Sequence, residues 1–393
     1  MPGSVIVAAT RTPIGKLSGA FASLTAVDLG AIAIRDALAH AGLDGANVDY
    51  VVMGQVLQAG TGQITARQAA VAAGIPMLVP AITINKVCLS GLNALYLADQ
   101  MIQSGEANVV VAGGMESMTR APYLVPGARS GLRMGNADMV DSMIHDGLWC
   151  AFDAAHMGSG TERYTTDFGI ARDRQDTFAT QSHERASAAL KSGALAEEIT
   201  PVVVPQRKGD PITIDTDEGI RPGTTTDVLA ELRPAFAPDG TITAGNASQI
   251  SDGAAALIVM HADRAAELGI EPLAEIVSYG MVAGPDTSLL HQPSRAIRNA
   301  LERSNYTVAD LDLFEINEAF AAVALASIDD LGIDHTRVNV NGGAIALGHP
   351  IGMSGARLAG TLLHELRRRG GGMGAAALCG GGGQGDALIL RVR

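Results

Sequence analysis

The chain has 393 residues, of which 47% are hydrophobic and 18% are charged, and its formal net charge at pH 7 is −13. This length and apolar content predict a globular protein of two or three domains with an ample core. The negative charge argues against a nucleic-acid-binding surface, although a local cluster of arginines could still hold an anionic ligand.

The N-terminal sequence MPGSVIVAATRTPIG passes directly into a strand-like apolar run. It lacks the basic and long apolar regions of a signal peptide and the Arg- and Ser-rich pattern of a transit peptide. No run in the chain is long enough to span a membrane. We therefore expect a cytoplasmic protein that binds neither membranes nor nucleic acids. Cysteines at positions 88, 150 and 379 cannot form a disulfide framework and lack zinc-ligand spacing, so we expect free thiols and no metal site.

An internal repeat organises the chain. AIRDAL at 33–38 matches AIRNAL at 296–301, and VDYVVMGQ from Val48 matches LDLFEINE from Leu311 at the same spacing. CLSGLNALYLADQMIQSG, in the first half, then matches GMSGARLAGTLLHELRRRG in the second. Three matches in the same order, at nearly one spacing, indicate the duplication of half a chain.

Each repeat predicts alternating strands and helices. Apolar residues at 92, 95, 98, 101 and 102 have helical periodicity, and NVVVAGG at 108–114 is a short buried strand. The equivalent helix, at about 354–369, ends in RRRG and is followed by the strand AAALCGG. This alternation predicts an α/β fold with helices over a mostly parallel sheet.

The two halves differ by one insertion. In the second half the final strand, DALILRV, follows Cys379 within a few residues, whereas in the first half the matching AAALIVM is delayed until 254–260. We therefore predict a first half at 1–114 plus 251–270, an inserted cap at 115–250 and a second half at 271–393. We expect the active site where the halves meet.

Cys88 immediately precedes the first-half helix. There it faces unpaired backbone N–H groups and the positive end of the helix dipole, both of which favour a thiolate. His349 has nearly the same position in the second half, where Pro350 biases it away from helix. If a pseudo-twofold axis relates the halves, Cys88 and His349 approach each other across it. Taken singly, the cysteine could be a small buried hydrophobe and the histidine structural.

Two further segments converge on the same interface, NEAF at 317–320 and LCGGGGQG at 378–385. On its own, Asn317 could simply cap a helix and Cys379 could simply pack in a strand. Cys150 has no partner motif, and we expect it to be structural. The convergence of four chemically suited segments on one interface favours a catalytic site.

These motifs resemble the thiolase family, acetyl-CoA acetyltransferases in particular. The resemblance rests on NKVCLSG, NEAF, VNVNGGAIALGHPIGMSGAR and CGGGGQG, and it extends from RTPIGK to the C-terminus through VVAGGMESMT and GNASQISDGAAA. It implies the duplicated fold of that family and an acyltransferase that makes or cleaves a C–C bond between acyl-CoA units. Two acetyl-CoA would give acetoacetyl-CoA and CoA through a covalent thioester. It implies no cofactor beyond coenzyme A and a homo-oligomer, dimeric or tetrameric.

The resemblance also implies roles for single residues. Cys88 would hold the acyl group as a thioester, His349 would act as the base that activates it, and Cys379 would exchange a proton with the acetyl methyl group. One oxyanion hole would use His349 with a water held by Asn317. The other would use the backbone N–H groups of Cys88 and Gly381.

Acyl-CoA contacts are implied mainly in the inserted cap. The implied contacts are His156, Met157, Arg221, Phe236, Ser248 and Phe320. An arginine suits the nucleotide end of CoA and apolar walls suit the pantetheine arm, although Arg221 could also be solvated surface. Arg163, Arg207 and Lys208 are expected to be ordinary surface.

Several alternatives stay open. A ketoacyl synthase-like condensing enzyme shares the duplication and the nucleophile but carries histidine or asparagine in place of Cys379. An inactive acyl-CoA-binding module would leave Cys88 unacylated. The His156-Met157 pair resembles the sequence of the short-chain enzymes, in which the methionine narrows the acyl pocket. This favours an acetyl-CoA acetyltransferase over a broad-range 3-ketoacyl-CoA thiolase of fatty-acid β-oxidation. Leu89, where many relatives carry Ala or Gly, could shape the acyl pocket or point into the core.

Overall fold

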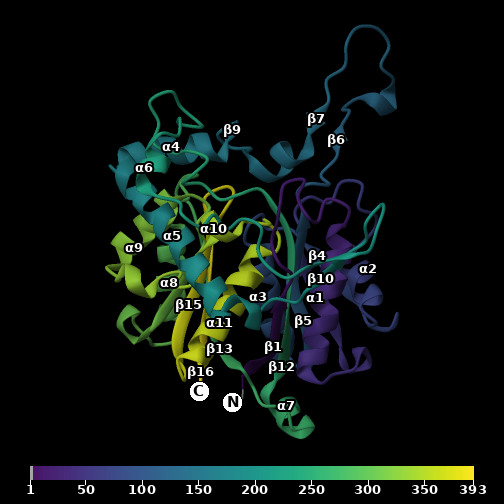
Figure 1. Cartoon of the computed structure of the whole chain (residues 1–393). Coiled ribbons are helices and arrows are strands. Elements are labelled where there is room, and N and C mark those ends of the chain that lie inside the picture. The colour runs from purple at the N-terminus through teal and green to yellow at the C-terminus, as the bar shows by residue number, and fades with distance from the viewer. Residues whose placement is uncertain (1–2) are drawn as a thin grey trace.

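The computed structural model describes residues 3–393 and places two similar halves side by side on a central sheet of ten strands (Figure 1). The order of the main strands across the sheet is β14-β15-β16-β13-β1-β12-β5-β3-β4. The first half supplies β1 (Ser4–Arg11), β3 (Tyr50–Gly54), β4 (Ala81–Ile84), β5 (Val109–Ser117) and β12 (Ser251–His261), with the short β2 (Gly15–Lys16) paired to β12. The second half supplies β13 (Ala274–Ala283), β14 (Leu313–Ile316), β15 (Gly372–Gly380) and β16 (Gln384–Val392).

The strand order repeats between the halves. From the outside inward, β3, β5, β12 and β1 hold the places that β14, β15, β16 and β13 hold in the second half. The edge strand β4 is matched in the second half by a single parallel bridge between Phe314 and Val338. The duplication indicated by the sequence is therefore confirmed in the fold.

The sheet is mixed, so the expectation of a mostly parallel sheet is wrong. Among the strands of residues 3–393, parallel pairing joins β3 to β4 and β5, and β14 to β15. The final strand of each half runs antiparallel between its neighbours, as β16 does between β15 and β13. The turn at 381–383 is too short for the crossover that a parallel partner requires, so β16 has to return antiparallel.

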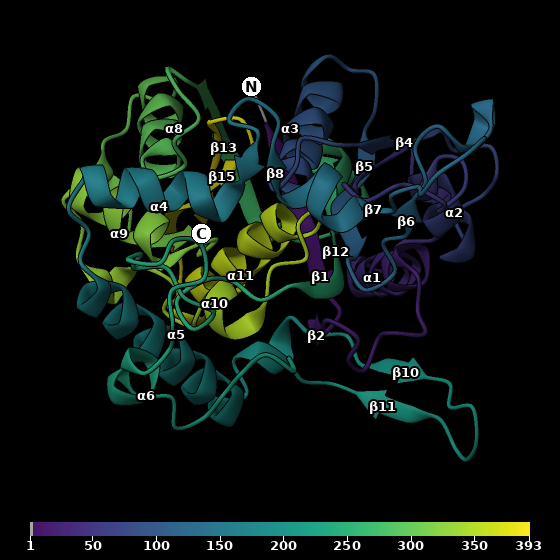
Figure 2. The same ribbon diagram turned by 90° about the horizontal axis from the view of Figure 1, so that it is seen from above.

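Helices cover the sheet and also lie between the halves. α1 (Ala26–Ala41) and α2 (Thr65–Ala72) pack on the first half, and α8 (Gln292–Glu302) packs on the second with α9 (Ala321–Leu331) beside it. α3 (Ser90–Gln103) and α11 (Ser354–Arg368) contact each other and strands of both halves (Figure 2). Across the described part of the chain, every helix is too short or too polar to cross a lipid bilayer.

Residues 118–250 form an excursion between β5 and β12, which pair antiparallel with each other. Its elements are β6 (Tyr123–Leu124), β7 (Val140–Asp141), β8 (Trp149–Cys150), β9 (Ala155–His156), α4 (Met157–Asp167), α5 (Arg172–Ser192), β10 (Val202–Val204), β11 (Ile212–Ile214) and α6 (Thr226–Ala230). The β6–β7 arm and the β10–β11 hairpin project from the body (Figures 1 and 2), whereas α5 packs on α9 and α10 (Ala344–Leu347). β5 thus continues past residue 114, where the sequence placed the start of the insertion.

The repeated Ser-Gly pair brings the two central helices into close contact. A Cβ atom on Gly355 would lie 2.3 Å from the backbone nitrogen of Leu92, and one on Gly91 would lie 2.8 Å from a backbone nitrogen of α11. These glycines therefore allow the N-terminal ends of α3 and α11 to meet backbone to backbone. The segments that precede the two helices, with Cys88 and His349, are drawn together by the same contact.

Candidate active site

A narrow cavity of about 50 Å³ lies where the two halves meet the insertion. Its walls include the turn before α3, the end of β15, the loop before α11 and the residues that precede α9. Most of the predicted site residues line it, namely Cys88, His156, Met157, Ser248, Phe320, His349, Cys379 and Gly381. Asn317 and Phe236 lie behind this lining, each against one of its histidines.

Cys88 lies in the turn that connects β4 to α3, next to the start of the helix at Ser90. The preceding residue, Val87, has a φ of +52°, a strained conformation for a β-branched side chain. Its N–H donates to Asn85 Oδ1 at 2.9 Å, and its carbonyl accepts from Ser90 Oγ at 2.7 Å. The serine of the repeated Ser-Gly pair therefore helps to hold the strained turn that presents the thiol.

The ring of His349 is held at both nitrogens. Nδ1 lies 2.5 Å from Ser354 Oγ, whose hydroxyl donates to the Pro350 carbonyl at 2.8 Å. Because the serine hydrogen points to that carbonyl, the network assigns the ring proton to Nδ1 and leaves Nε2 as the basic nitrogen, 3.3 Å from Asn317 Nδ2. Burial, with the charge of Arg357, lowers the pKa of His349 to about 3. The ring is thus neutral at physiological pH and free to accept a proton at Nε2.

Both cavity cysteines are thiols in the resting protein. Burial raises the pKa of Cys88 to about 12, and the charge of Glu116 contributes to the rise. Burial also raises the pKa of Cys379, and the neighbouring Cys88 adds to that rise. The position before a helix favours a thiolate, but in the free protein the loss of water around the sulfur of Cys88 outweighs the nearby N–H groups.

Leu89 points into the core. It is fully buried, belongs to the apolar cluster between the halves and is absent from the described lining of the cavity. A Cβ atom on Gly380 would lie 2.5 Å from Leu89 Cγ, so Gly380 makes room for this leucine. A Cβ atom on Gly381 would instead make ordinary contacts, 3.5 Å from Val87 Cγ2 and 3.6 Å from Met157 Sδ. Packing therefore requires glycine at 380 more strictly than at 381.

An aromatic wall from the insertion faces the start of α9. The ring of Phe236 stacks on His156 with 4.9 Å between centroids and meets Phe320 edge-on at 6.0 Å. His156 is also the N-cap of α4, where its Nδ1 accepts a hydrogen bond from the Gly158 N–H at 3.0 Å. Burial lowers the pKa of His156, so the wall is uncharged at neutral pH. Such a surface suits an apolar, amide-bearing ligand arm.

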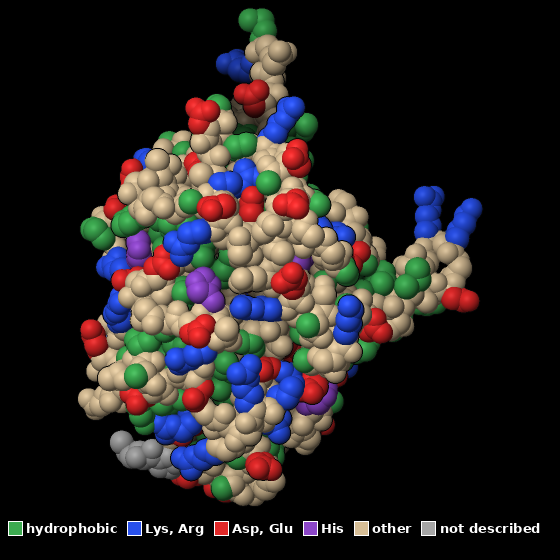
Figure 3. All heavy atoms as spheres, turned by 60° about the vertical axis from the view of Figure 1, so that its left-hand side comes forward, with side chains coloured by type: hydrophobic (Ala, Val, Ile, Leu, Met, Phe, Trp, Pro, Cys, Tyr) green, Lys and Arg blue, Asp and Glu red, His purple; other side chains and the backbone are tan. Residues whose placement is uncertain are grey.

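Arg221 lies outside this cavity. Its side chain is exposed, and its backbone N–H donates to His183 Nδ1 at 3.2 Å. Arg207 and Lys208 are exposed between β10 and β11, and Figure 3 shows two basic side chains at the tip of a projecting arm. Arg163 is also mostly exposed. The role of Arg221 at the nucleotide end of CoA stays a prediction.

Several residues of the site were missed by sequence reasoning. Leu148, Leu289 and Ile351 line the cavity, and Ser354 orients His349. Ile351 lies within the HPIG motif and Ser354 within the repeated Ser-Gly pair, so both motifs contained a usable signal. Leu148 ends a π-helical segment of the insertion, and Leu289 precedes α8. Nothing in the local sequence of either leucine marks it as a cavity residue.

Glu116 is a further missed residue, at the contact between the halves. Its buried carboxylate accepts hydrogen bonds from the N–H groups of Val56 (2.9 Å) and Leu57 (3.2 Å) in the first half and Gly352 (3.0 Å) in the second. Burial raises its pKa to about 7 against the opposing effect of these bonds. The carboxylate thus ties the loop that carries His349 to the half that carries Cys88.

Comparisons with known proteins point to one family along essentially the whole chain. The family model described as "Thiolase, N-terminal domain" matches residues 4–263, and "Thiolase, C-terminal domain" matches residues 270–392. A probable acetyl-CoA acetyltransferase of Mycolicibacterium smegmatis is 58% identical over 98% of this chain and 100% of its own, and the acetyl-CoA acetyltransferase of Pseudomonas aeruginosa is 55% identical over 99% of both. The crystal structure of the Bacillus anthracis acetyl-CoA acetyltransferase superposes with a TM-score of 0.97 at 40% identity and covers 100% of this chain and 99% of that one.

Proposed function

This chain belongs to the thiolase family, and from that premise we propose that it is an acetyl-CoA acetyltransferase, which condenses two acetyl-CoA to acetoacetyl-CoA and CoA and catalyses the reverse cleavage. The observation that carries the proposal is the single cavity that holds two thiols and a neutral imidazole between the duplicated halves. These are the nucleophile and the proton carriers that the reaction needs.

The first half-reaction transfers an acetyl group to Cys88. As its sulfur attacks the thioester carbon of acetyl-CoA, His349 Nε2 takes the thiol proton, so Cys88 does not have to ionise before the attack. The Cys379 thiol gives its proton to the departing CoA thiolate. The products are acetylated Cys88, protonated His349, a Cys379 thiolate and free CoA.

The second half-reaction forms the C–C bond. The Cys379 thiolate takes a proton from the methyl group of a second acetyl-CoA, and the resulting carbanion attacks the acetyl carbon on Cys88. The Cys88 thiolate leaves and recovers its proton from His349, which restores the resting enzyme. Asn317 Oδ1 is buried with no protein partner within residues 3–393, so it can accept a hydrogen bond from the water proposed for one oxyanion hole, while Cys88 and Gly381 supply N–H groups to the other.

The narrow cavity favours a short acyl group. Leu148, Leu289, Phe320 and Met157 close around about 50 Å³, which leaves little room for chain atoms beyond acetyl or acetoacetyl. The second candidate is a broad-range 3-ketoacyl-CoA thiolase, which would need these side chains to move apart.

We further infer a homo-oligomer that acts in lipid metabolism in the cytoplasm. Support for self-association comes from the edge of the sheet, where Met77, Leu78 and Ile82, in or before β4, are exposed. An apolar edge strand of this kind is suited to being covered by a second copy. Sedimentation of the purified chain would measure the number of copies.

The proposal is tested by CoA-dependent cleavage of 3-ketoacyl-CoA substrates from four carbons upward, together with two cysteine variants. Cys88→Ser should abolish the acetyl-enzyme, measured by mass spectrometry after mixing with acetyl-CoA. Cys379→Ser should still acetylate Cys88 but slow condensation by about 10²–10⁴-fold. Rapid cleavage of acetoacetyl-CoA alone supports the acetyltransferase. Equal rates on longer chains would replace it with the broad-range enzyme, and near-wild-type condensation by the Cys379 variant would refute the two-cysteine scheme.

A further inference from the structure

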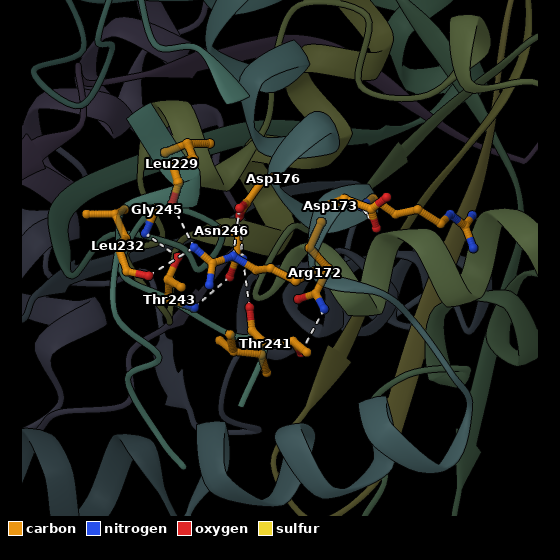
Figure 4. A network of polar contacts seen from close by, with 12 residues as sticks. Arg172, Asp173, Asp176, Leu229, Leu232, Thr241, Thr243, Gly245 and Asn246 are labelled. Atoms are coloured by element: carbon orange, nitrogen blue, oxygen red, sulfur yellow. Dashed lines mark hydrogen bonds and ion pairs between the residues drawn. The ribbon is translucent and has the colours of Figure 1, made fainter. Parts of the chain in front are cut away.

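A polar network centred on α5 contains none of the proposed catalytic residues (Figure 4). At its centre is Asp176, whose side chain is 4% exposed. Asp176 Oδ2 accepts from Arg172 Nε at 2.6 Å, and Oδ1 accepts from Asn246 Nδ2 at 2.9 Å. One buried carboxylate therefore uses both oxygens to join the first turn of α5 to a distant loop.

The Asn246 side of the network leads to the cavity wall. Asn246 is fully buried, and its Oδ1 accepts from the Thr243 N–H at 2.8 Å. Its carbonyl accepts from the Ala321 N–H at 2.8 Å, and the Ser248 N–H donates to the Ala319 carbonyl at 3.1 Å. This short ladder sets the positions of Ser248 and of Ala319 and Phe320, which precede α9, and these three residues line the cavity together.

The Arg172 side of the network leads to the aromatic wall. Arg172 Nη2 donates to the carbonyls of Leu229 at 2.7 Å and Leu232 at 3.0 Å. From Leu232 the chain continues to Phe236, which stacks on His156. The two sides are also joined directly, because the Ala235 N–H donates to the carbonyl at 242 at 2.8 Å. Residues 232–246, the binding hairpin, are thus held at both ends by Asp176.

We propose that Asp176 is a positioning residue that, through Arg172 and Asn246, holds the binding hairpin and the adjoining Ser248, so that Phe236 and Ser248 receive the pantetheine arm of acyl-CoA. This inference rests on the proposed function. The catalytic side chains have other supports, since the Asn317 N–H donates to the Ala377 carbonyl at 2.9 Å and Ser354 orients His349. Loosening the binding hairpin therefore weakens substrate binding far more than it slows chemistry.

The test compares Asp176→Asn with the wild-type chain. Asparagine keeps the shape but places an NH₂ group against one of two donors, so one end of the binding hairpin is released. We expect KM for acetoacetyl-CoA and Kd for CoA, measured by calorimetry, to rise about tenfold, with kcat within about twofold of wild type. Arg172→Lys keeps the charge but loses the planar guanidinium, which reaches Asp176 through Nε and both carbonyls through Nη2. It should therefore also raise KM, and it serves as the test if Asp176→Asn does not fold.

The matched control is Asp329→Asn. Asp329, on α9, forms an exposed ion pair with Arg174, which lies on α5 two residues before Asp176. The control substitution should leave KM and Kd unchanged, because exposed pairs contribute little. Unchanged KM and Kd in both Asp176→Asn and Arg172→Lys, or a loss of kcat at constant KM, would overturn the positioning role. If the wild-type chain failed to cleave acetoacetyl-CoA, the proposed function would fall, while the change in Kd for CoA would still decide the role of Asp176.

Discussion

At the scale of single residues, burial decides which form of each site group the free protein holds. The cavity removes water from Cys88 and His349 alike, and in both cases it favours the neutral form. Reactivity must then come from the substrate, since its carbonyl develops the charge that draws the proton from sulfur to Nε2. The resting site is protected from oxidants and alkylating agents, which react with thiolates.

Alkylation of Cys88 by iodoacetamide measures this protection. A pKa raised to about 12 means less thiolate at every lower pH, so the rate at pH 8 should be at least about a hundredfold below that of an exposed thiol. The rate should keep rising beyond pH 10. Mass spectrometry identifies the modified residue and Cys88→Ser is the control. A plateau between pH 7 and 9 would show a preformed thiolate and contradict this account.

At the scale of elements, the contact of α3 with α11 places the two chemical halves of the site. Gly355 lets the two backbones come into contact. The serine of each Ser-Gly pair also forms hydrogen bonds with the segment before its helix: Ser90 with Val87, and Ser354 with His349 and Pro350. The same dipeptide thus packs a helix and orients a catalytic loop in each half. Helix geometry and site geometry are therefore fixed by common residues.

Gly355→Ala should separate the two helices. The new Cβ would sit 2.3 Å from a backbone atom, Leu92 N, which no side-chain rotation can relieve. We expect a loss of about 1–3 kcal/mol in the free energy of unfolding by urea and a lower kcat. Gly360→Ala, on the same helix, is the control. Its Cβ would lie 3.7 Å from Ala9 Cβ, and it should stabilise by about 0.5–1 kcal/mol. Equal stability of the two variants would contradict the close-contact argument.

At the scale of the whole molecule, buried ionisable groups join parts that are distant in sequence. Arg11 of β1 pairs with Glu198 and Asp217 of the insertion, and Arg357 of α11 pairs with Glu315 of β14. Burial raises the pKa of Glu315 to about 8 despite its pairing with Arg357. The stability of the fold therefore depends on protons held at buried contacts between segments that are distant in sequence.

Stability should fall as pH rises from 6.5 to 8. Glu116 and Glu315 titrate near pH 7 and 8 in the fold but near 4.5 when unfolded, so the native state binds more protons in this window. Burial lowers the pKa of His349, His183 and His156 below the ordinary 6.5, so these histidines oppose the decline near pH 6.5 and have little effect above about pH 7.5, where the two carboxyl groups dominate. We expect a decline of about 1–3 kcal/mol in the free energy of urea unfolding. Glu116→Gln should flatten the slope, and a rise with pH in the wild type would show that the sign is wrong.

The sequence could predict the meeting of Cys88 and His349, because a duplication with matching helix starts implies a pseudo-twofold relation. It could not give the protonation state of Cys88, since burial depends on all the surrounding chain. It also could not reveal Glu116, whose three donors come from segments far apart in sequence. The predicted strand direction was wrong, because the alternation of strands and helices does not show that a three-residue turn makes β16 run antiparallel to its neighbours.

The interrupted pairing of β5 with β12 also bears on how the chain is made. Three residues join β15 to β16, whereas residues 118–250 separate β5 from its partner β12. Closing the longer loop costs about 3 kcal/mol more in chain entropy. During synthesis on the ribosome, the first half cannot complete its sheet until about two-thirds of the chain has emerged, and until then the edges of β1 and β5 that β12 later covers are available to chaperones.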